Sequence, residues 1–243
     1  MRSVVVDTIQ RIDSNIAINH VLLEIEIIGQ ANGVSHSLPV AVATHDGREY
    51  AVVLHVHGLT CILLQHSTII RAFVDSNLFQ WGPEARMMPA EICTRMNDAL
   101  SGKDNENGMF VTLWLGLVDL NTGHLDYCNA GHNPPVIVGG DHHGDFLEMI
   151  ANAPIGLWPE LEYEGEEIDS IKNRLLFIYT DGLNEAENPQ QEQFSDDRLL
   201  EVLRRTNFEN AQQVIESMKQ EVEAYRNGAE PNDDFTMMCV KVR

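Results

Sequence analysis

Three aspartates in this 243-residue chain stand at the ends of apolar segments, where they could bind a metal ion. Asp181 directly follows the apolar run 174–180, and Asp233 and Asp234 directly precede the apolar run 235–242. Carboxylate oxygens at the end of a buried strand are natural ligands for hard cations such as Mg²⁺ and Mn²⁺. Asp181-Gly182 is also a common turn signal, so the spacing by itself leaves a purely structural role open.

The segments around these aspartates predict strands and helices that are interspersed along the chain. Strands are predicted at 20–29, 49–56, 174–180 and 235–242, and the turn Asn121-Thr122-Gly123 predicts a hairpin in the segment 109–138. Helices are predicted at 60–75, from Pro89 to a stop at Gly102, from Ser195 onward, and at 211–226 between Asn210 and Gly228. Because strands and helices do not alternate regularly, the pattern indicates an α+β fold with mainly antiparallel sheets. No segment reads as a dividing linker, so we expect one domain over residues 1–243.

Composition restricts the classes of partner. The chain carries 37 acidic and 16 basic residues, a formal net charge of −21, which repels nucleic acid and anionic membranes. No apolar stretch is long enough to span a membrane, and the start of the sequence lacks the features of a signal peptide. Four widely spaced cysteines, without a CxxC pair, are typical of buried free thiols in a reducing compartment. We therefore expect a cytoplasmic protein.

Three motifs carry a resemblance to a known family. The stretches 109–138 (MFVTLWLGLVDLNTGHLDYCNAGHNPPVIV), 174–201 (beginning RLLFIYTDG) and 232–242 (NDDFTMMCVKV) are similar, in this order, to motifs of PPM-type protein phosphatases of the stage II sporulation protein E branch. The resemblance is specific from about residue 85 to 243 and weaker from about 20 to 84.

The resemblance implies a fold, an activity and ligands. The fold would be two antiparallel sheets packed face to face and flanked by helices. The activity would be removal of phosphate from serine or threonine of a signalling protein, often a small anti-sigma-antagonist domain. Two Mn²⁺ or Mg²⁺ ions would activate a bridging water. Asp181 and Asp233 resemble metal ligands of the family, with Asp234 beside Asp233. The turn around His132 (AGHNPP) would be structural.

The N-terminal third departs from the family pattern. His55 stands where the family has the metal-bridging aspartate of its second acidic motif. The first acidic motif should fall within residues 33–39, yet no acidic residue lies between Gln30 and Thr44. Two divalent cations close together need carboxylates to offset their repulsion. We therefore expect impaired catalysis, with an inactive pseudophosphatase that binds a regulatory partner as the alternative. In that case the chain would need no cofactor.

A rebuilt site is a further hypothesis. His55 and His57 are two residues apart on a predicted strand, so both would lie on one face. With His36 and Asp181 they could bind Zn²⁺ or another borderline cation. The competing interpretation is that these histidines only fill a vacated pocket. The sequence predicts neither the partner nor the oligomeric state.

Overall fold

A computed structural model describes residues 10–11, 23–30, 41–45, 48–57, 88–101, 110–139, 142–205, 208–233 and 235–242. Within these ranges, the side chains described are those of residues 50–53, 88–101, 110–139, 144–205, 208–233 and 235–242. The predicted helix 60–75, the segment 33–39 with His36, and Asp234 lie outside the described residues.

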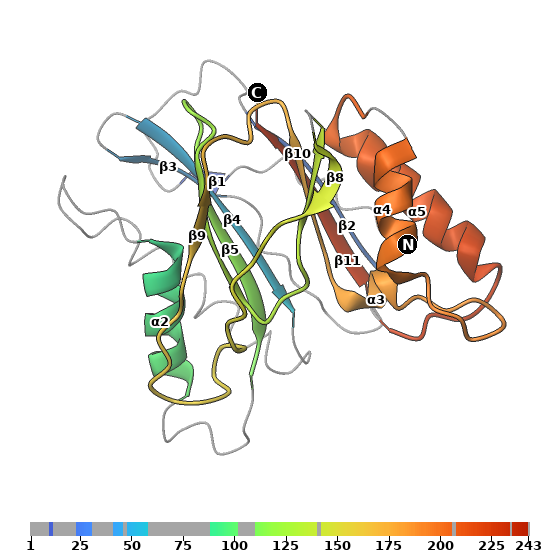
Figure 1. Cartoon of the computed structure of the whole chain (residues 1–243), viewed down its shortest axis with the longest axis horizontal. Helices are drawn as coiled ribbons and strands as arrows, with labels where there is room; N and C mark the ends of the chain where they lie inside the picture. Colours follow the sequence, from blue (N-terminus) through green and yellow to red (C-terminus); the bar gives the residue numbers. More distant parts are fainter. Residues whose placement is uncertain are drawn as a thin grey trace.

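The described strands form two sheets (Figure 1). Sheet A has the order β1-β3-β4-β5-β6-β9, with bounds β1 Gln10–Arg11, β3 Ala41–His45, β4 Arg48–His57, β5 Thr112–Asp119, β6 Leu125–Ala130 and β9 Glu166–Ile168. Sheet B has the order β2-β11-β10-β7-β8, with bounds β2 Leu23–Gln30, β11 Phe235–Val242, β10 Leu175–Tyr179, β7 Val136–Gly139 and β8 His142–Phe146. Neighbouring strands run antiparallel, except that β1 pairs with β3 in parallel.

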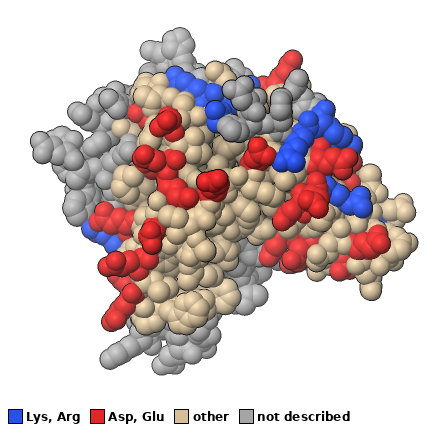
Figure 2. Space-filling model, in the orientation of Figure 1, with Lys and Arg blue, Asp and Glu red and all other residues tan. Residues whose placement is uncertain are grey.

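Helices cover the outer faces of the two sheets, which gives four layers (Figure 1). Helix α2 (Pro89–Leu100) packs on sheet A, and helices α4 (Ser195–Arg205) and α5 (Ala211–Arg226) pack on sheet B. The short helix α3 (Asp181–Asn184) follows β10. This arrangement confirms the predicted α+β fold of two packed antiparallel sheets with flanking helices. Figure 2 shows Asp and Glu side chains spread over one face of the molecule, as the net charge leads one to expect.

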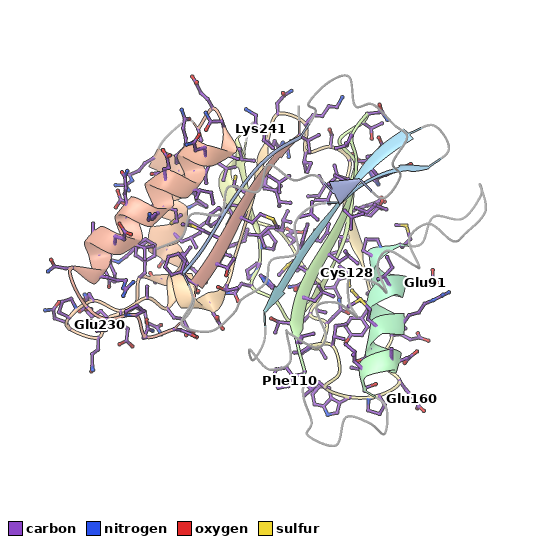
Figure 3. All side chains as sticks on the ribbon, turned by 180° about the vertical axis from the view of Figure 1, so that it is seen from behind. Glu91, Phe110, Cys128, Glu160, Glu230 and Lys241 are labelled. Atoms are coloured by element: carbon purple, nitrogen blue, oxygen red, sulfur yellow. The ribbon has the colours of Figure 1, made fainter. Side chains whose placement is uncertain are left out.

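Within the described part of the chain, three apolar clusters hold these layers together. One lies between sheet A and α2, where Ile92 and Met96 of the helix meet Cys128 of β6; Figure 3 shows Cys128 on the side of the sheet that faces α2. The second fills the space between the sheets and includes Trp114, Ile178 and Met238. The third joins sheet B to α4 and α5. Alternate residues of one strand enter different clusters because side chains alternate between the faces of a sheet.

The local sequence signals agree with these elements. Helix α2 begins with Pro89 at its first position, and the side chain of Asn210 accepts a hydrogen bond of 2.8 Å from the backbone N–H of Gln213 to begin α5. Helix α5 ends at Arg226, and its C-cap residue Asn227 has a left-handed φ of 43°, one residue before the predicted stop at Gly228. The predicted hairpin joins β5 to β6.

Gly116 of β5 leaves room for the ring of Trp114, and this close approach yields a stability prediction. A Cβ at position 116 would lie 2.4 Å from Cη2 and 2.6 Å from Cζ3 of Trp114. Trp114 is fully buried, so its ring has little space into which to move. We expect Gly116→Ala to lower the free energy of unfolding by about 2 kcal/mol, measured by urea denaturation. In a Trp114→Phe background, which removes the clashing atoms, the same substitution should cost clearly less; an equal cost would contradict the overpacking argument.

Candidate metal centre

Asp181 lies two residues beyond the fully buried strand β10 of sheet B. All five residues of β10 are buried, and the chain turns after them into α3, with Thr180 at the N-cap. The backbone N–H of Gly182 donates a hydrogen bond of 2.9 Å to Oδ1 of Asp181, which holds this half-buried carboxylate against the first turn of the helix. The apolar strand therefore places an acidic group at the edge of the core.

The register of β10 and β11 brings Asp233 to the same end of sheet B. Tyr179 pairs with Met237, and the next pair of residues is joined by two hydrogen bonds: the Thr180 N–H donates to Thr236 O over 2.9 Å, and the Thr236 N–H donates to Thr180 Oγ1 over 2.8 Å. The loop before β11, which holds the exposed Asp233, is also tied to the end of α3. There Asn232 Nδ2 donates to Glu185 O over 2.8 Å.

A polar network that joins β10, α3 and α4 holds the segment around Asp181 in place. Asp196, in the first turn of α4, accepts hydrogen bonds from the Tyr179 hydroxyl over 3.2 Å and from Asn184 Nδ2 over 2.9 Å, both at Oδ1. Burial is the main cause that raises the pKa of the Tyr179 hydroxyl well above its ordinary value, and the neighbouring Asp196 carboxylate raises it further. The hydroxyl therefore stays protonated and remains a hydrogen-bond donor. Sequence reasoning missed Asp196; its only signal was an acidic residue at the start of a predicted helix.

His55 and His57 lie near the end of β4, as the sequence predicts. His55 pairs with Trp114 and His57 with Thr112 of β5. Figures 1 and 3 both show β4 ending at the same end of the sandwich as α3 and the start of β11. The side chains of both histidines lie outside the described part of the structure, so the hypothesis of a Zn²⁺ site with His36 and Asp181 stays a prediction.

His132 belongs to a structural turn, as predicted. Its backbone N–H donates to Asn129 Oδ1 over 2.8 Å, and Asn129 Nδ2 donates back to His132 O over 2.8 Å. The imidazole is buried and its Nδ1 lies 2.9 Å from the carbonyl oxygen of Asn133. The backbone contacts account for the turn without a ligand.

Among the residues whose side chains the structure describes, Asp181 and Asp233 are the predicted metal ligands at this end of the sandwich. Asp181 and Asp233 carry two negative charges, which offset the charge of a single divalent ion, whereas Asp234 and the side chain of His55 lie outside the described residues. Two divalent cations about 4 Å apart repel each other strongly unless carboxylates lie between and around them. The two described aspartates fit one divalent cation, and a second ion would need further carboxylates.

Comparison with known proteins identifies the family. The pattern of the stage II sporulation protein E (SpoIIE) family matches residues 58–243, more than half of the chain. The chain belongs to the SpoIIE family. This family comprises phosphatase domains of the PP2C type, and its match covers all three of the motifs from which the resemblance was drawn.

Relatives of this SpoIIE-family chain are larger proteins. It is 33% identical over 147 residues to protein IcfG of Synechocystis, a match that covers 59% of this chain and 22% of IcfG. It is 24% identical over 140 residues to phosphoserine phosphatase RsbP of Bacillus subtilis, covering 55% of this chain and 34% of RsbP. The matched part thus spans about a fifth to a third of these relatives.

A solved structure agrees with the fold. The PP2C phosphatase domain of SpoIIE from Bacillus subtilis, solved with a fragment of its regulatory domain, superposes with a TM-score of 0.69 at 18% identity, covering 90% of this chain and 63% of that one. Among the residues that the structure describes, no helix combines the length and the apolar character needed to cross a bilayer.

Proposed function

We propose that this SpoIIE-family chain recognises a regulatory phosphoprotein in a signalling pathway and hydrolyses its phosphoserine or phosphothreonine with impaired efficiency. The observation that carries the proposal is that this chain has acidic residues at only some of the family's acidic positions. Asp181 and Asp233 lie at one end of sheet B, whereas His55 on β4 aligns with the family's bridging aspartate and no acidic residue lies between Gln30 and Thr44.

The missing carboxylates weaken catalysis through the metal ions. Mn²⁺ or Mg²⁺ bound at the family's acidic positions would supply an activated water and would offset the charge of the phosphate. Asp181, Asp233 and Asp234 would hold one such ion. A neutral imidazole at position 55 adds no negative charge and bridges two ions poorly, so the second ion would bind weakly. The expected consequence is a slow enzyme rather than an altered substrate class.

The substrate class follows from chemistry and from family membership. A chain with a net charge of −21 repels phosphate, so a bound cation is needed to bridge the protein and a phosphorylated partner. Partners of the anti-sigma-antagonist type, used in partner switching, suit this role. RsbP, a relative that carries the name phosphoserine phosphatase, supports the choice of phosphoserine.

The second candidate function is an inactive pseudophosphatase that binds the same class of partner. The absence of acidic residues between Gln30 and Thr44 favours it, because it removes the family's first acidic motif altogether.

We also propose a cytoplasmic location and one domain over residues 1–243. The three described cysteines (Cys93, Cys128 and Cys239) are buried free thiols, as in proteins of reducing compartments.

A calorimetric titration of the metal-free protein with Mn²⁺ tests the proposal. We expect weak binding that does not saturate below millimolar Mn²⁺, together with slow, Mn²⁺-dependent hydrolysis of a phosphoserine peptide. Undetectable binding and no hydrolysis would favour the pseudophosphatase. Tight binding of two ions in the micromolar range would contradict the proposal, because it would mean that other residues have rebuilt the dinuclear site.

A further inference from the structure

A second cluster of potential metal ligands lies on sheet A, away from Asp181. Asp126 of β6 and Glu167 of β9 are directly opposite each other in the antiparallel register, and His124 immediately precedes β6. Asp126 lies on the same face of β6 as Cys128 and Ala130, which pack against α2, so it is on the outer face of the sheet. The cluster therefore belongs to sheet A, whereas the predicted ligands Asp181 and Asp233 adjoin strands of sheet B.

The distances within this cluster match the spacing of ligands around one ion. His124 Nε2 lies 3.3 Å from Asp126 Oδ1 and 3.7 Å from Glu167 Oε2. One ligand atom from each of the three residues lies within 4.8 Å of the other two. Ligand atoms bound tetrahedrally at about 2.1 Å from Zn²⁺ are roughly 3.4 Å apart. The three side chains could thus bind one ion after only small rotations.

The hairpin before β6 holds His124 in place. Asp119 Oδ1 accepts hydrogen bonds from the N–H groups of Asn121 and Thr122, over 2.8 and 3.3 Å. The N–H of His124 donates to Thr122 Oγ1 over 3.2 Å, and its carbonyl accepts from the Asp119 N–H over 2.9 Å. A ligand held by a fixed backbone loses less freedom when it binds an ion.

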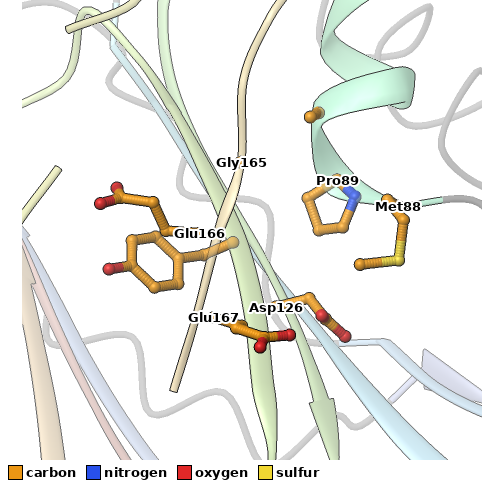
Figure 4. Close-up of a pocket in the computed structure, with 8 residues that line it drawn as sticks. Met88, Pro89, Asp126, Gly165, Glu166 and Glu167 are labelled. Carbon is orange, nitrogen blue, oxygen red and sulfur yellow. The ribbon is translucent and has the colours of Figure 1, made fainter. Parts of the chain in front are cut away.

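Beside the cluster is a pocket of about 310 Å³ between the start of α2 and the strands β6 and β9 (Figure 4). Asp126 and Glu167 line it together with Glu166, Met88 and Pro89, and Figure 4 shows the carboxylates of Asp126 and Glu167 side by side. The Asp126 side chain is only 1% exposed, whereas those of His124 and Glu167 are 24% and 70% exposed. An ion can therefore enter from solvent and reach a buried carboxylate.

We propose that His124, Asp126 and Glu167 form a binding site for one divalent cation of the Zn²⁺ class. One imidazole and two carboxylates form a mixed set of nitrogen and oxygen ligands that suits a borderline cation, and the two carboxylates neutralise its charge. Three protein ligands leave a fourth coordination position for water. The bound ion joins β6, β9 and the hairpin. This site is independent of the proposed phosphatase function.

The test is a Zn²⁺ titration of the full chain in competition with a chromophoric chelator. It uses an Asp181→Asn background so that the candidate metal centre contributes little. We expect one Zn²⁺ per chain, with affinity lowered roughly tenfold or more by His124→Ala and by Glu167→Gln. Both side chains are accessible to solvent, so folding should survive, which circular dichroism checks. The matched control is Glu164→Gln, an exposed residue on the same segment as Glu167.

The visible absorption of bound Co²⁺ provides a second measurement, which a purely structural role of His124 would not affect. Its visible absorption is intense in four-coordinate sites and weak in six-coordinate ones, so we expect an intense band that His124→Ala removes and Glu164→Gln keeps. Zn²⁺ affinity that is equal in His124→Ala and in the control would overturn the proposal. Failure of the parent chain to compete with the chelator would overturn it as well, and His124 would then serve only as an ion-pair partner.

Discussion

His55→Asp, combined with acidic residues restored between Gly33 and Pro39, is expected to raise the affinity for Mn²⁺ by roughly a hundredfold and to increase phosphatase activity. Each added carboxylate supplies a negative charge next to the ions. Close charge pairs of this kind are worth a few kcal/mol at the effective dielectric constant of a protein surface, and each 1.36 kcal/mol corresponds to a tenfold change. Calorimetry gives the affinity and stoichiometry, and hydrolysis of a phosphoserine peptide gives the activity.

His57→Asp is the matched control for this experiment. It makes the same chemical change two residues further along β4, opposite Thr112 instead of Trp114. If position 55 is the bridging position, the aspartate at 57 should recover much less affinity in the same background. Equal gains from the two substitutions, or none from either, would show that the alignment of the N-terminal third with the family motifs is wrong.

Asp181→Asn is expected to abolish most of the Mn²⁺ affinity of the restored variant and to lower its activity by roughly a hundredfold or more. Asparagine has nearly the shape of aspartate and its Oδ1 can still accept the hydrogen bond from the Gly182 N–H, so the first turn of α3 should persist. The free energy of unfolding should therefore change little. The measurements are the Mn²⁺ titration, the peptide assay and a urea denaturation curve.

Asp197→Asn is the control that separates a ligand from a general charge effect. Asp197 is exposed and lies in the first turn of α4, next to Asp196, which holds Tyr179 and Asn184. Its substitution removes one negative charge, as Asp181→Asn does, and leaves both hydrogen bonds between Thr180 and Thr236 in place. If Asp181→Asn left activity unchanged, or lowered it only as much as Asp197→Asn, the family mechanism would not apply to this chain.

Much of the secondary structure could be predicted because its signals are local. The apolar run 174–180 before Asp181 predicted β10, and Pro89, Asn210 and the apolar spacing predicted α2 and α5. Elements with weak local signals were missed. Strand β9 covers only three residues (Glu166–Ile168), two of them glutamates, and forms because its backbone pairs with β6. Helix α3 has only four residues, which is too few for a periodic apolar pattern.

The candidate sites divide in the same way. The sequence alone determined the family through three ordered motifs, and it predicted Asp181, Asp233 and Asp234 as metal ligands and His55 as the replacement of a bridging aspartate. Only the tertiary structure decided that the ends of β10 and β11 adjoin through Thr180 and Thr236, and that Asp126 meets Glu167 across β6 and β9. The physical reason is that strand register depends on backbone pairing between segments far apart in the chain, which no local pattern records.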